Sequence, residues 1–425
     1  MKRTLLILIL FIAVAGPDCS RPSSDVTTIT FWGFGNEGEM VAPLIKEFER
    51  RNPGIVVKMQ QIPWTAAHEK LLTAFAGEST PDVCQLGNTW IPEFTVLRSL
   101  ESLKPYIDRS SSSDLADIFP GVLKTNIIDS VLYGVPWYVD TRVVYYRKDI
   151  LKKAGFAEFP KTWKEVFTAC ERIKQQAKAN NTVCYPFFLP TSEWVPAIAL
   201  GMQSGGNFLK EKNSRGNFSG KEFSRAFSLL GELYEKEYSP SGMQLITNLY
   251  NSFADGLITM YITGPWNIGE FSRRIPPELQ KEWMTAPLPS MDSLSPGTSL
   301  PLGTSLVMFR TSKHKDAAWK LIEFLSSTEQ SIAFYRITGN LPPRQSAWKD
   351  SSLTNNPYAA AFHTQLQRVD PLPPVPEWEQ IVIRLQTYVE MIATRTKTPE
   401  QALKQFDGEV DVMLEKRRWI VEHQR

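Results

Sequence analysis

The stretch TTITFWGFGNEGEMVAPLIKEFERRNPGIVVKMQQI, residues 27–62, decides the fold. Residues 27–32 have the pattern of a β-strand, and residues 37–51 have that of an amphipathic helix, which Asn52-Pro53-Gly54 ends. Residues 55–62 have the pattern of a second strand. A strand, a helix and a further strand form the repeating unit of an open, mainly parallel sheet. We therefore expect an α/β protein.

The same alternation continues on the carboxyl side of this stretch. A helical pattern at 65–76 precedes a buried strand pattern at 82–86, and another helix is expected from residue 91 onward. Strand patterns at 132–139 and 142–147 flank a sharp change of chain direction. Further strands are expected at 185–189, 257–262, 285–289 and 303–309, and further helices at 162–178, 222–234, 314–326, 378–393 and 399–419. The helix at 162–178 begins with a capping box of Thr162 and Glu165.

The length of the chain and its second α/β series predict two lobes. At 425 residues the chain is longer than one hydrophobic core usually serves. Several strand-like segments cross between the two series, so each lobe combines separate parts of the chain. We predict a first lobe at 26–139 plus 290–328 and a second at 140–289 plus 329–425, joined by a hinge. Ligands of open α/β sheets bind beyond the carboxyl ends of strands, which places a ligand cleft between the lobes.

The first residues have the features of an export signal. Lys2 and Arg3 precede an apolar run at 5–15 that is too short to span a bilayer as a mature helix. We predict a signal peptide at 1–18, cut either after Ala13-Val14-Ala15 or before Cys19. Cleavage before Cys19 would leave a lipid anchor on that cysteine. In both cases the mature protein is periplasmic or otherwise extracytoplasmic, and it meets the membrane only through this anchor or a membrane partner.

Three further cysteines, Cys84, Cys170 and Cys184, show no C-x-x-C spacing of a metal or redox site. Cys84 lies in an apolar run and is expected in the core. Cys170 and Cys184 either form a disulfide or are two separate buried thiols.

The composition excludes several classes of function. The chain has 47 basic and 45 acidic residues spread along its length, whereas a nucleic-acid-binding protein gathers Lys and Arg on one face. Its 4 histidines are far apart, without the spacing of metal ligands. No G-x-S-x-G nucleophile motif occurs. We expect no nucleic-acid partner, no metal, no cofactor and no catalytic residues.

Aromatic and polar side chains recur at the ends of successive predicted strands. The candidate ligand-binding residues are Trp32, Asn36, Glu37, Trp64, His68, Asn88, Thr89, Trp90, Asp140, Arg142, Glu193, Trp194, Trp266, Gly303 and Thr304, with Trp378 after the proline-rich segment 371–376. Aromatic rings stack on the C–H faces of a sugar, and sugar hydroxyls need carboxylate, amide and guanidinium partners. Core packing explains any single tryptophan more simply, and the helix dipole explains Glu37. The recurrence at strand after strand is what predicts a sugar site.

An ordered series of motifs extends over the mature chain. They are ITFWG at 29–33, LIKEFE at 44–49, PDV at 81–83, YGVPW at 133–137, YRKDIL at 146–151, MYITGPW at 260–266 and KHKDAAWK at 313–320. With these motifs the chain resembles the extracellular sugar-binding proteins of ABC importers, the family that includes maltose-binding protein. The resemblance implies a periplasmic-binding-protein fold, whose lobes close around an unaltered sugar. It also implies a monomer that delivers the sugar to permease subunits.

The resemblance implies roles for individual residues. Trp266 matches the stacking aromatic residue of the family, and Asp140 matches an acidic acceptor of sugar hydroxyls. Glu193 and Trp194 fall in a sugar-contacting loop of the second lobe. Two pairs depart from charged pairs of the maltose-binding branch: Thr89 with Trp90, and Asn36 with Glu37. These departures leave a sugar as the expected ligand but argue against maltose itself.

Two enzyme hypotheses compete with sugar binding. Residues 33–38, GFGNEG, match the dinucleotide motif G-x-G-x-x-G between a strand and a helix, but no acidic residue ends the strand at 55–62 to hold a ribose. A secreted glycoside hydrolase would use Asp140 and Glu193 as its two carboxylates. Nothing near either residue in the sequence indicates altered acidity, and the family resemblance favours binding alone.

Overall fold

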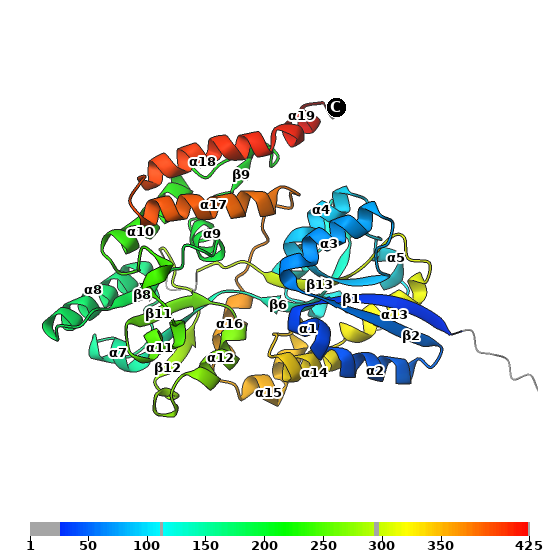
Figure 1. Ribbon diagram of the computed structural model, residues 1–425, viewed down its shortest axis with the longest axis horizontal. Helices are drawn as coiled ribbons and strands as arrows, with labels where there is room; N and C mark the ends of the chain where they lie inside the picture. Colours follow the sequence, from blue (N-terminus) through cyan, green and yellow to red (C-terminus); the bar gives the residue numbers. More distant parts are fainter. Residues whose placement is uncertain (1–25, 111–113, 293–296, 424–425) are drawn as a thin grey trace, which may run out of the picture.

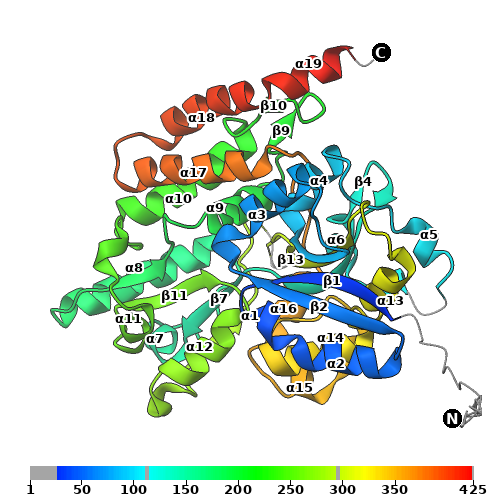
Figure 2. The same ribbon diagram turned by 45° about the vertical axis from the view of Figure 1, so that its right-hand side comes forward.

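In the computed structural model the chain forms two α/β lobes, which lie side by side in Figures 1 and 2. The structure describes residues 26–110, 114–292 and 297–423. The predicted signal peptide and Cys19 lie outside these residues. In the described part of the chain, no helix combines the length and the apolar character needed to cross a membrane.

The first lobe is built on a five-stranded sheet with the order β2-β1-β3-β13-β6. Strands β1, β2 and β3 are parallel, and β13 runs antiparallel to β3 and β6. The pleat of β1 sends Phe31 to a cluster that contains Trp137, and Phe34 to another cluster on the opposite face. Helices therefore cover both faces of this sheet. The elements of this lobe are β1 (Thr27–Phe34), α1 (Gly35–Met40), α2 (Ala42–Arg51), β2 (Ile55–Ile62), α3 (Trp64–Ala76), β3 (Val83–Gly87), η1 (Asn88–Trp90), α4 (Ile91–Val96), α5 (Lys104–Ile107), η2 (Leu115–Asp117), α6 (Pro120–Lys124), β4 (Ile127–Ile128), β5 (Val131–Leu132), β6 (Gly134–Asp140), β13 (Leu302–Met308), α13 (Lys315–Leu325), α14 (Thr328–Thr338), η5 (Ser346–Lys349) and α15 (Ser351–Thr354).

The second lobe is built on a four-stranded sheet with the order β12-β7-β11-β8. Strand β7 is antiparallel to β11 and β12, and β11 is parallel to β8. Helices α17 and α18 pack on each other and on α10, on the side of the lobe at the top of Figure 1. The elements of this lobe are β7 (Val143–Arg147), α7 (Lys148–Lys153), α8 (Trp163–Ala179), β8 (Tyr185–Phe188), α9 (Val195–Gln203), β9 (Leu209–Lys210), β10 (Arg215–Gly216), α10 (Lys221–Glu235), η3 (Met243–Leu245), α11 (Leu249–Ala254), β11 (Ile258–Thr263), α12 (Trp266–Arg274), η4 (Pro277–Leu279), β12 (Trp283–Ala286), α16 (Ala360–Leu366), α17 (Trp378–Ala393), α18 (Pro399–Met413) and α19 (Glu415–His423).

The lobes are connected where the chain crosses from one sheet to the other. Strand β6 leads into β7 through Thr141 and Arg142, and the segment after β12 returns to β13. The Thr141 hydroxyl donates a hydrogen bond to the Ser299 hydroxyl over 3.0 Å, which ties these two crossings together. Ser299 also forms a β-bridge with Val369, which lies on the segment that leads to α17. The three segments around Thr141, Ser299 and Val369 therefore lie together, and we call them the hinge region.

The structure confirms the α/β class, and two predicted helices differ from the observed ones. The helix expected at 37–51 is divided into α1 and α2 at Val41. Pro43 lies in the first turn of α2 and has no N–H, so it cannot continue the hydrogen bonds of α1. The helix expected at 399–419 is divided into α18 and α19 at Leu414. Helix α9 was not predicted because it is buried almost all round and lacks the one-sided periodicity of a surface helix.

Helix α14 bears on the predicted division into lobes. Phe334 stacks on Trp137 of β6 with 4.4 Å between ring centroids, and Glu329 pairs with Arg51 of α2 over 3.0 Å. These contacts fasten α14 to the first sheet, whereas α16 packs on β7 and β12 of the second sheet. The division remains a proposal, and the packing favours a first lobe that includes α14.

The described cysteines are free thiols. Cys84, Cys170 and Cys184 are buried and form no disulfide, so separate thiols are the alternative that the structure supports for Cys170 and Cys184. Burial raises the pKa of the Cys84 and Cys170 thiols well above the usual value. Both therefore stay protonated and unreactive near neutral pH.

Candidate ligand-binding cleft

A cavity of about 680 Å³ lies between the two lobes. Asn36 and Glu37 of α1 line it from the first lobe, together with Asn340 after α14. Trp266 of α12 lines it from the second lobe. Ligand pockets for small molecules typically enclose about 300–1,000 Å³. The cavity therefore has the size for a small ligand that touches both lobes.

Glu37 is the polar centre on the first-lobe side. Its carboxylate accepts hydrogen bonds from the Trp64 indole over 3.4 Å, the Tyr138 hydroxyl over 3.4 Å and the Asn340 amide over 3.2 Å. These donors come from three different parts of the chain and converge on one carboxylate. Glu37 is consequently held in place and still borders the cavity, where it can accept a hydrogen bond from a ligand hydroxyl.

An aromatic cluster lies behind Glu37. The Trp64 ring packs edge-on against Phe34 at 5.2 Å and against Trp90 at 5.9 Å between centroids. The His68 ring lies 5.0 Å from that of Trp90. Trp64 is 37% exposed, so one part of this cluster faces solvent. The structure thus brings together four residues predicted from separate strand ends: Glu37, Trp64, His68 and Trp90.

Trp266 is the exposed aromatic side chain on the second-lobe side. It begins α12 directly after Gly264-Pro265, and 46% of it is exposed. Its six-membered ring folds back over Gly264, where an added Cβ would lie 2.0 Å from Cζ3. Only glycine leaves room for this ring position. The Arg142 guanidinium carbon lies 4.6 Å from the ring centroid and covers one face of the ring.

Two partly buried carboxylates, Asp140 and Glu193, lie near Arg142. The Arg142 Nη1 donates a hydrogen bond to Asp140 over 2.5 Å, and Arg142 itself is buried. Burial raises the pKa of Asp140, and Arg142 opposes this shift. Burial also raises the pKa of Glu193. The positive charge of Arg142 opposes this rise, and the negative charge of Asp140 adds to it. The Tyr261 hydroxyl donates to Glu193 over 3.5 Å. The Arg142 guanidinium thus interacts with two carboxylates, by a hydrogen bond with Asp140 and electrostatically with Glu193. The Glu193 carboxylate can accept further hydrogen bonds.

The structure places other candidates away from this cavity. Trp32 packs on the first-lobe core with Lys70 over its ring at 5.3 Å, and Trp194 packs on the second-lobe core. Thr304 and Trp378 are each 1% exposed. Gly303 has φ 112°, and an added Cβ would lie 2.3 Å from the Tyr138 carbonyl oxygen. These five residues are explained by packing and backbone geometry, and any role for them in binding stays a prediction.

Asn88 and Thr89 lie at the edge of the contact between the lobes. The Asn88 Oδ1 accepts a hydrogen bond from the Ser305 hydroxyl over 2.9 Å, and Asn88 is buried. Thr89 faces the amino end of α17. Both border a cavity of about 200 Å³ next to Trp378, separate from the one that Glu37 and Trp266 share.

Sequence patterns missed most of the residues that border the cavity or hold its polar groups, and Tyr138, Tyr261 and Asn340 are three examples. Tyr138 precedes Asp140 by two positions on β6, so the strand alternation gave a usable signal for it. Tyr261 lies inside the fully buried strand β11, which offers no such signal. Asn340 reaches Glu37 from 303 residues away, a contact that no local pattern predicts.

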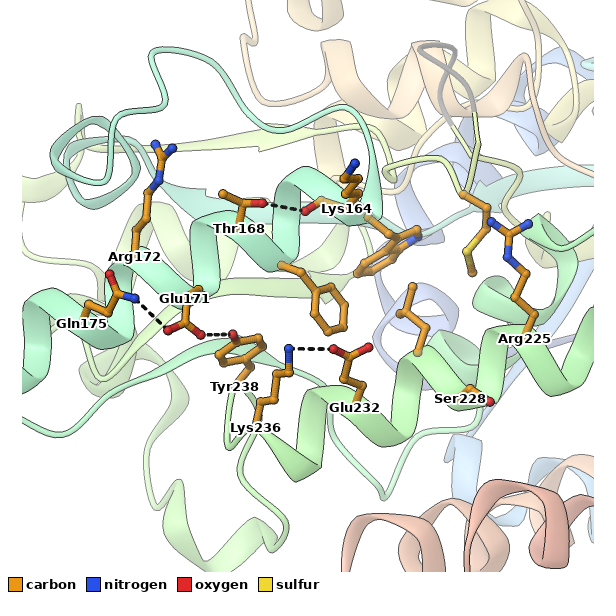
Figure 3. A pocket seen from close by; sticks show the side chains of 14 residues that line it. Lys164, Thr168, Glu171, Arg172, Gln175, Arg225, Ser228, Glu232, Lys236 and Tyr238 are labelled. Carbon is orange, nitrogen blue, oxygen red and sulfur yellow. Dashed lines mark hydrogen bonds and ion pairs between the residues drawn. The ribbon is translucent and has the colours of Figure 1, made fainter.

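A larger groove, of about 800 Å³, lies elsewhere (Figure 3). It runs between α8 and α10 on the second lobe and shares no residue with the inter-lobe cavity. Its polar groups are already paired, Glu171 with Tyr238 and Gln175, and Lys236 with Glu232. The inter-lobe cavity differs in being bordered by Glu37 of one lobe and Trp266 of the other. In the described residues, no group of three or more His, Cys, Asp or Glu side chains is arranged to hold a metal ion.

Two α/β lobes on a common hinge, with recognition groups on both sides of one cavity, define a two-lobed binding protein. The sequence model of the bacterial extracellular solute-binding proteins matches residues 35–332, more than half of the chain. The chain belongs to this family. It is therefore a solute-binding protein and not an enzyme.

Known proteins resemble the chain over nearly its whole length. The sugar-binding protein MalE from Xanthomonas citri is 44% identical with a TM-score of 0.90, and the match covers 94% of this chain and 100% of that one. Maltose-bound MalE3 from T. maritima is 25% identical with a TM-score of 0.75, over 91% of this chain and 100% of that one. The diacetylchitobiose-binding protein DasA of Streptomyces coelicolor is 26% identical, with coverage of 91% and 90%.

Proposed function

We propose that the chain binds a mono- or oligosaccharide between its lobes and delivers it to the permease of an ABC importer. The observation that carries the proposal is that Trp266 and Glu37 border one inter-lobe cavity from opposite lobes. An exposed indole offers a stacking face for a sugar ring, and a carboxylate accepts its hydroxyl protons. The names of the similar proteins, sugar-binding, maltose-bound and diacetylchitobiose-binding, support a carbohydrate ligand.

Binding closes the lobes in the proposed mechanism. A sugar that enters the open cleft contacts Trp266 of one lobe and Glu37 of the other. Only the closed form makes both contacts at once, so the sugar shifts the equilibrium toward closure by its differential affinity. Glu193 and Asp140, which lie beside the hinge, supply further acceptors. The permease then recognises the closed form.

A titration of the purified protein with mono- and oligosaccharides tests this function. Intrinsic tryptophan fluorescence reports binding, because Trp266 borders the cavity and Trp64 is hydrogen-bonded to Glu37, and both indoles are partly exposed. We expect a saturable signal and recovery of the sugar unaltered. No response to any sugar would refute the carbohydrate ligand, and recovery of shortened sugar would revive the glycoside hydrolase hypothesis with Asp140 and Glu193.

Trp266→Ala is the first variant to test. Loss of a stacking ring at the centre of a binding site costs about 1–3 kcal/mol, so the Kd should rise by about 5- to 150-fold. Calorimetric titration with the best sugar of the panel measures the change. Trp419→Ala is the matched control, since Trp419 is 61% exposed on α19 and does not border the cavity. Equal affinities of the two variants would remove Trp266 from the site.

The proposed function also requires export of the protein from the cytoplasm, for which residues 1–18 and Cys19 are the predicted signals. We propose that the signal peptide is removed, and that Cys19 either stays unmodified near the new amino terminus after cleavage behind Ala15 or becomes the lipid-modified amino-terminal residue itself. Mass spectrometry of the protein purified from cells distinguishes cleavage after Ala15 from cleavage before Cys19 with acylation. An intact Met1 in the exported protein would contradict both.

A further inference from the structure

Helix α17 of the second lobe touches the first lobe at its amino end. Trp378 anchors this end in the second-lobe core, where it packs 5.4 Å from Phe208. The next residue, Glu379, interacts with the Thr89 hydroxyl of η1 in the first lobe. In Figures 1 and 2 the amino end of α17 lies next to α3 and α4 of the first lobe. The contact therefore bridges the two lobes beside the cleft.

Charged groups surround this contact. His68 of α3 forms an ion pair with Glu93 of α4, with 2.6 Å between Nε2 and Oε2. Glu379 and Glu69, the latter on the same helix as His68, also interact electrostatically with the imidazole. The imidazole is thus paired with Glu93 of α4 and lies within electrostatic range of Glu69 on its own helix and of Glu379 on α17, whose amino end contacts η1. Only Glu379 among these belongs to the second lobe.

We propose that Glu379, Thr89, His68 and Glu93 form a pH-sensitive latch that holds the two lobes together. With His68 protonated, one cation lies between Glu93 of the first lobe and Glu379 of the second and favours closure. With His68 neutral, two carboxylates face each other without a cation, and closure is disfavoured. Glu379 and His68 act as positioning residues, because they set the geometry of the lobes rather than contact the ligand in the Glu37–Trp266 cavity.

The direction of the pH dependence follows from the groups involved. The hydrogen bond that His68 donates to Glu93, with smaller contributions from Glu379 and Glu69, raises the pKa of His68 against the effect of burial. Burial raises the pKa of Glu379, and Thr89 and His68 oppose this shift. Opening moves Glu379 away from His68 and exposes it to solvent. The pKa values of both His68 and Glu379 are therefore higher in the closed form, which binds more protons than the open form. Low pH therefore favours closure, and this contribution weakens as the pH rises through the His68 pKa.

NMR titration of the ligand-free protein tests the latch directly. We expect the imidazole pKa of His68 to be lower in Glu379→Gln than in the wild type, and unchanged in Glu390→Gln. Glu390 is an exposed carboxylate on the same helix and serves as the matched control. His68→Gln identifies the His68 signal among the 4 histidines. An unaltered His68 pKa in Glu379→Gln would overturn the proposal.

Small-angle X-ray scattering and sugar affinity supply the conformational readout. The radius of gyration should increase between pH 5.5 and pH 8.5 in the wild type and stay constant in His68→Gln. Because the closed form holds the proton of His68 more tightly, we expect the sugar to bind about three- to tenfold more weakly at pH 8.5 than at pH 5.5. Because the latch is relevant to sugar uptake only under the proposed function, the two can fail separately. A pH-independent radius of gyration refutes the latch, whereas a responsive latch without sugar binding refutes the proposed function.

Discussion

At the scale of single residues, Arg142 has two roles. It neutralises buried Asp140 and lies over one face of Trp266. Breaking a buried ion pair by removing one partner leaves an uncompensated charge, which is far more costly than the loss of an exposed pair. The same guanidinium therefore connects the stability of the hinge region with the shape of the ligand cleft.

Arg142→Gln should destabilise the protein by about 3 kcal/mol at pH 7.5, because Asp140 is left buried and unpaired. The pKa of Asp140 is already raised by burial and should rise further without Arg142. A carboxyl with a raised folded-state pKa destabilises the fold at pH values above that pKa, so the loss should shrink toward pH 5 as Asp140 takes up a proton. Denaturant unfolding at both pH values measures it.

The control for this prediction is Arg50→Gln. Arg50 pairs with Glu47 on α2, and its side chain is 71% exposed. Removal of such a surface pair should leave the free energy of unfolding nearly unchanged at either pH. A loss of stability in Arg142→Gln that is equally large at pH 5 would contradict the assignment to Asp140.

At the scale of elements, the residues at the amino end of α8 set where this helix begins. The Thr162 hydroxyl accepts a hydrogen bond from the Glu165 amide over 3.2 Å, and the Glu165 carboxylate accepts one from the Thr162 amide over 3.1 Å. This is the predicted capping box, and both of its bonds are present. A capping box can be recognised in a sequence because its two residues are only three positions apart.

Thr162→Ala should lower the free energy of unfolding of the second lobe by about 1 kcal/mol, since it leaves an amide at the start of α8 without a partner. Thr168→Ala is the control on the same helix. The Thr168 hydroxyl donates to the Lys164 carbonyl over 3.0 Å inside the helix, where that carbonyl already has a backbone partner. Chemical unfolding followed by circular dichroism should separate the two variants, and equal losses would refute the capping contribution.

At the scale of the whole molecule, the hinge region and the cleft couple the stability of the lobes to the ligand. The chain crosses between the lobes three times, and contacts among Thr141, Ser299 and Val369 hold these crossings together. Each lobe is therefore built from separate segments of the sequence. A ligand that contacts both lobes binds only when both are folded. Its binding free energy should therefore appear in the unfolding of each lobe.

A sugar at 100 times its Kd should stabilise the native protein by about 2.7 kcal/mol. Calorimetry should show the unfolding transitions of both lobes shifted upward, because Glu37 and Trp266 belong to different lobes. Stabilisation confined to one transition would mean that the sugar contacts one lobe only. Trp266→Ala, titrated at the same sugar concentration, should show a smaller shift of both transitions.

The class of fold and most of its elements can be predicted from the sequence alone, because strand and helix periodicity and end signals are properties of neighbouring residues. The sequence also proposed Glu37, Trp64, His68, Trp90 and Trp266 as site residues, since side chains after successive strands share one edge of a sheet, and their role in binding stays a prediction. Only the tertiary structure decided which candidates face the cleft. Trp266 is half exposed whereas Trp378 is buried, although both begin a helix near prolines. The difference lies in what packs against each ring, and the contacts that decide it come from distant parts of the chain.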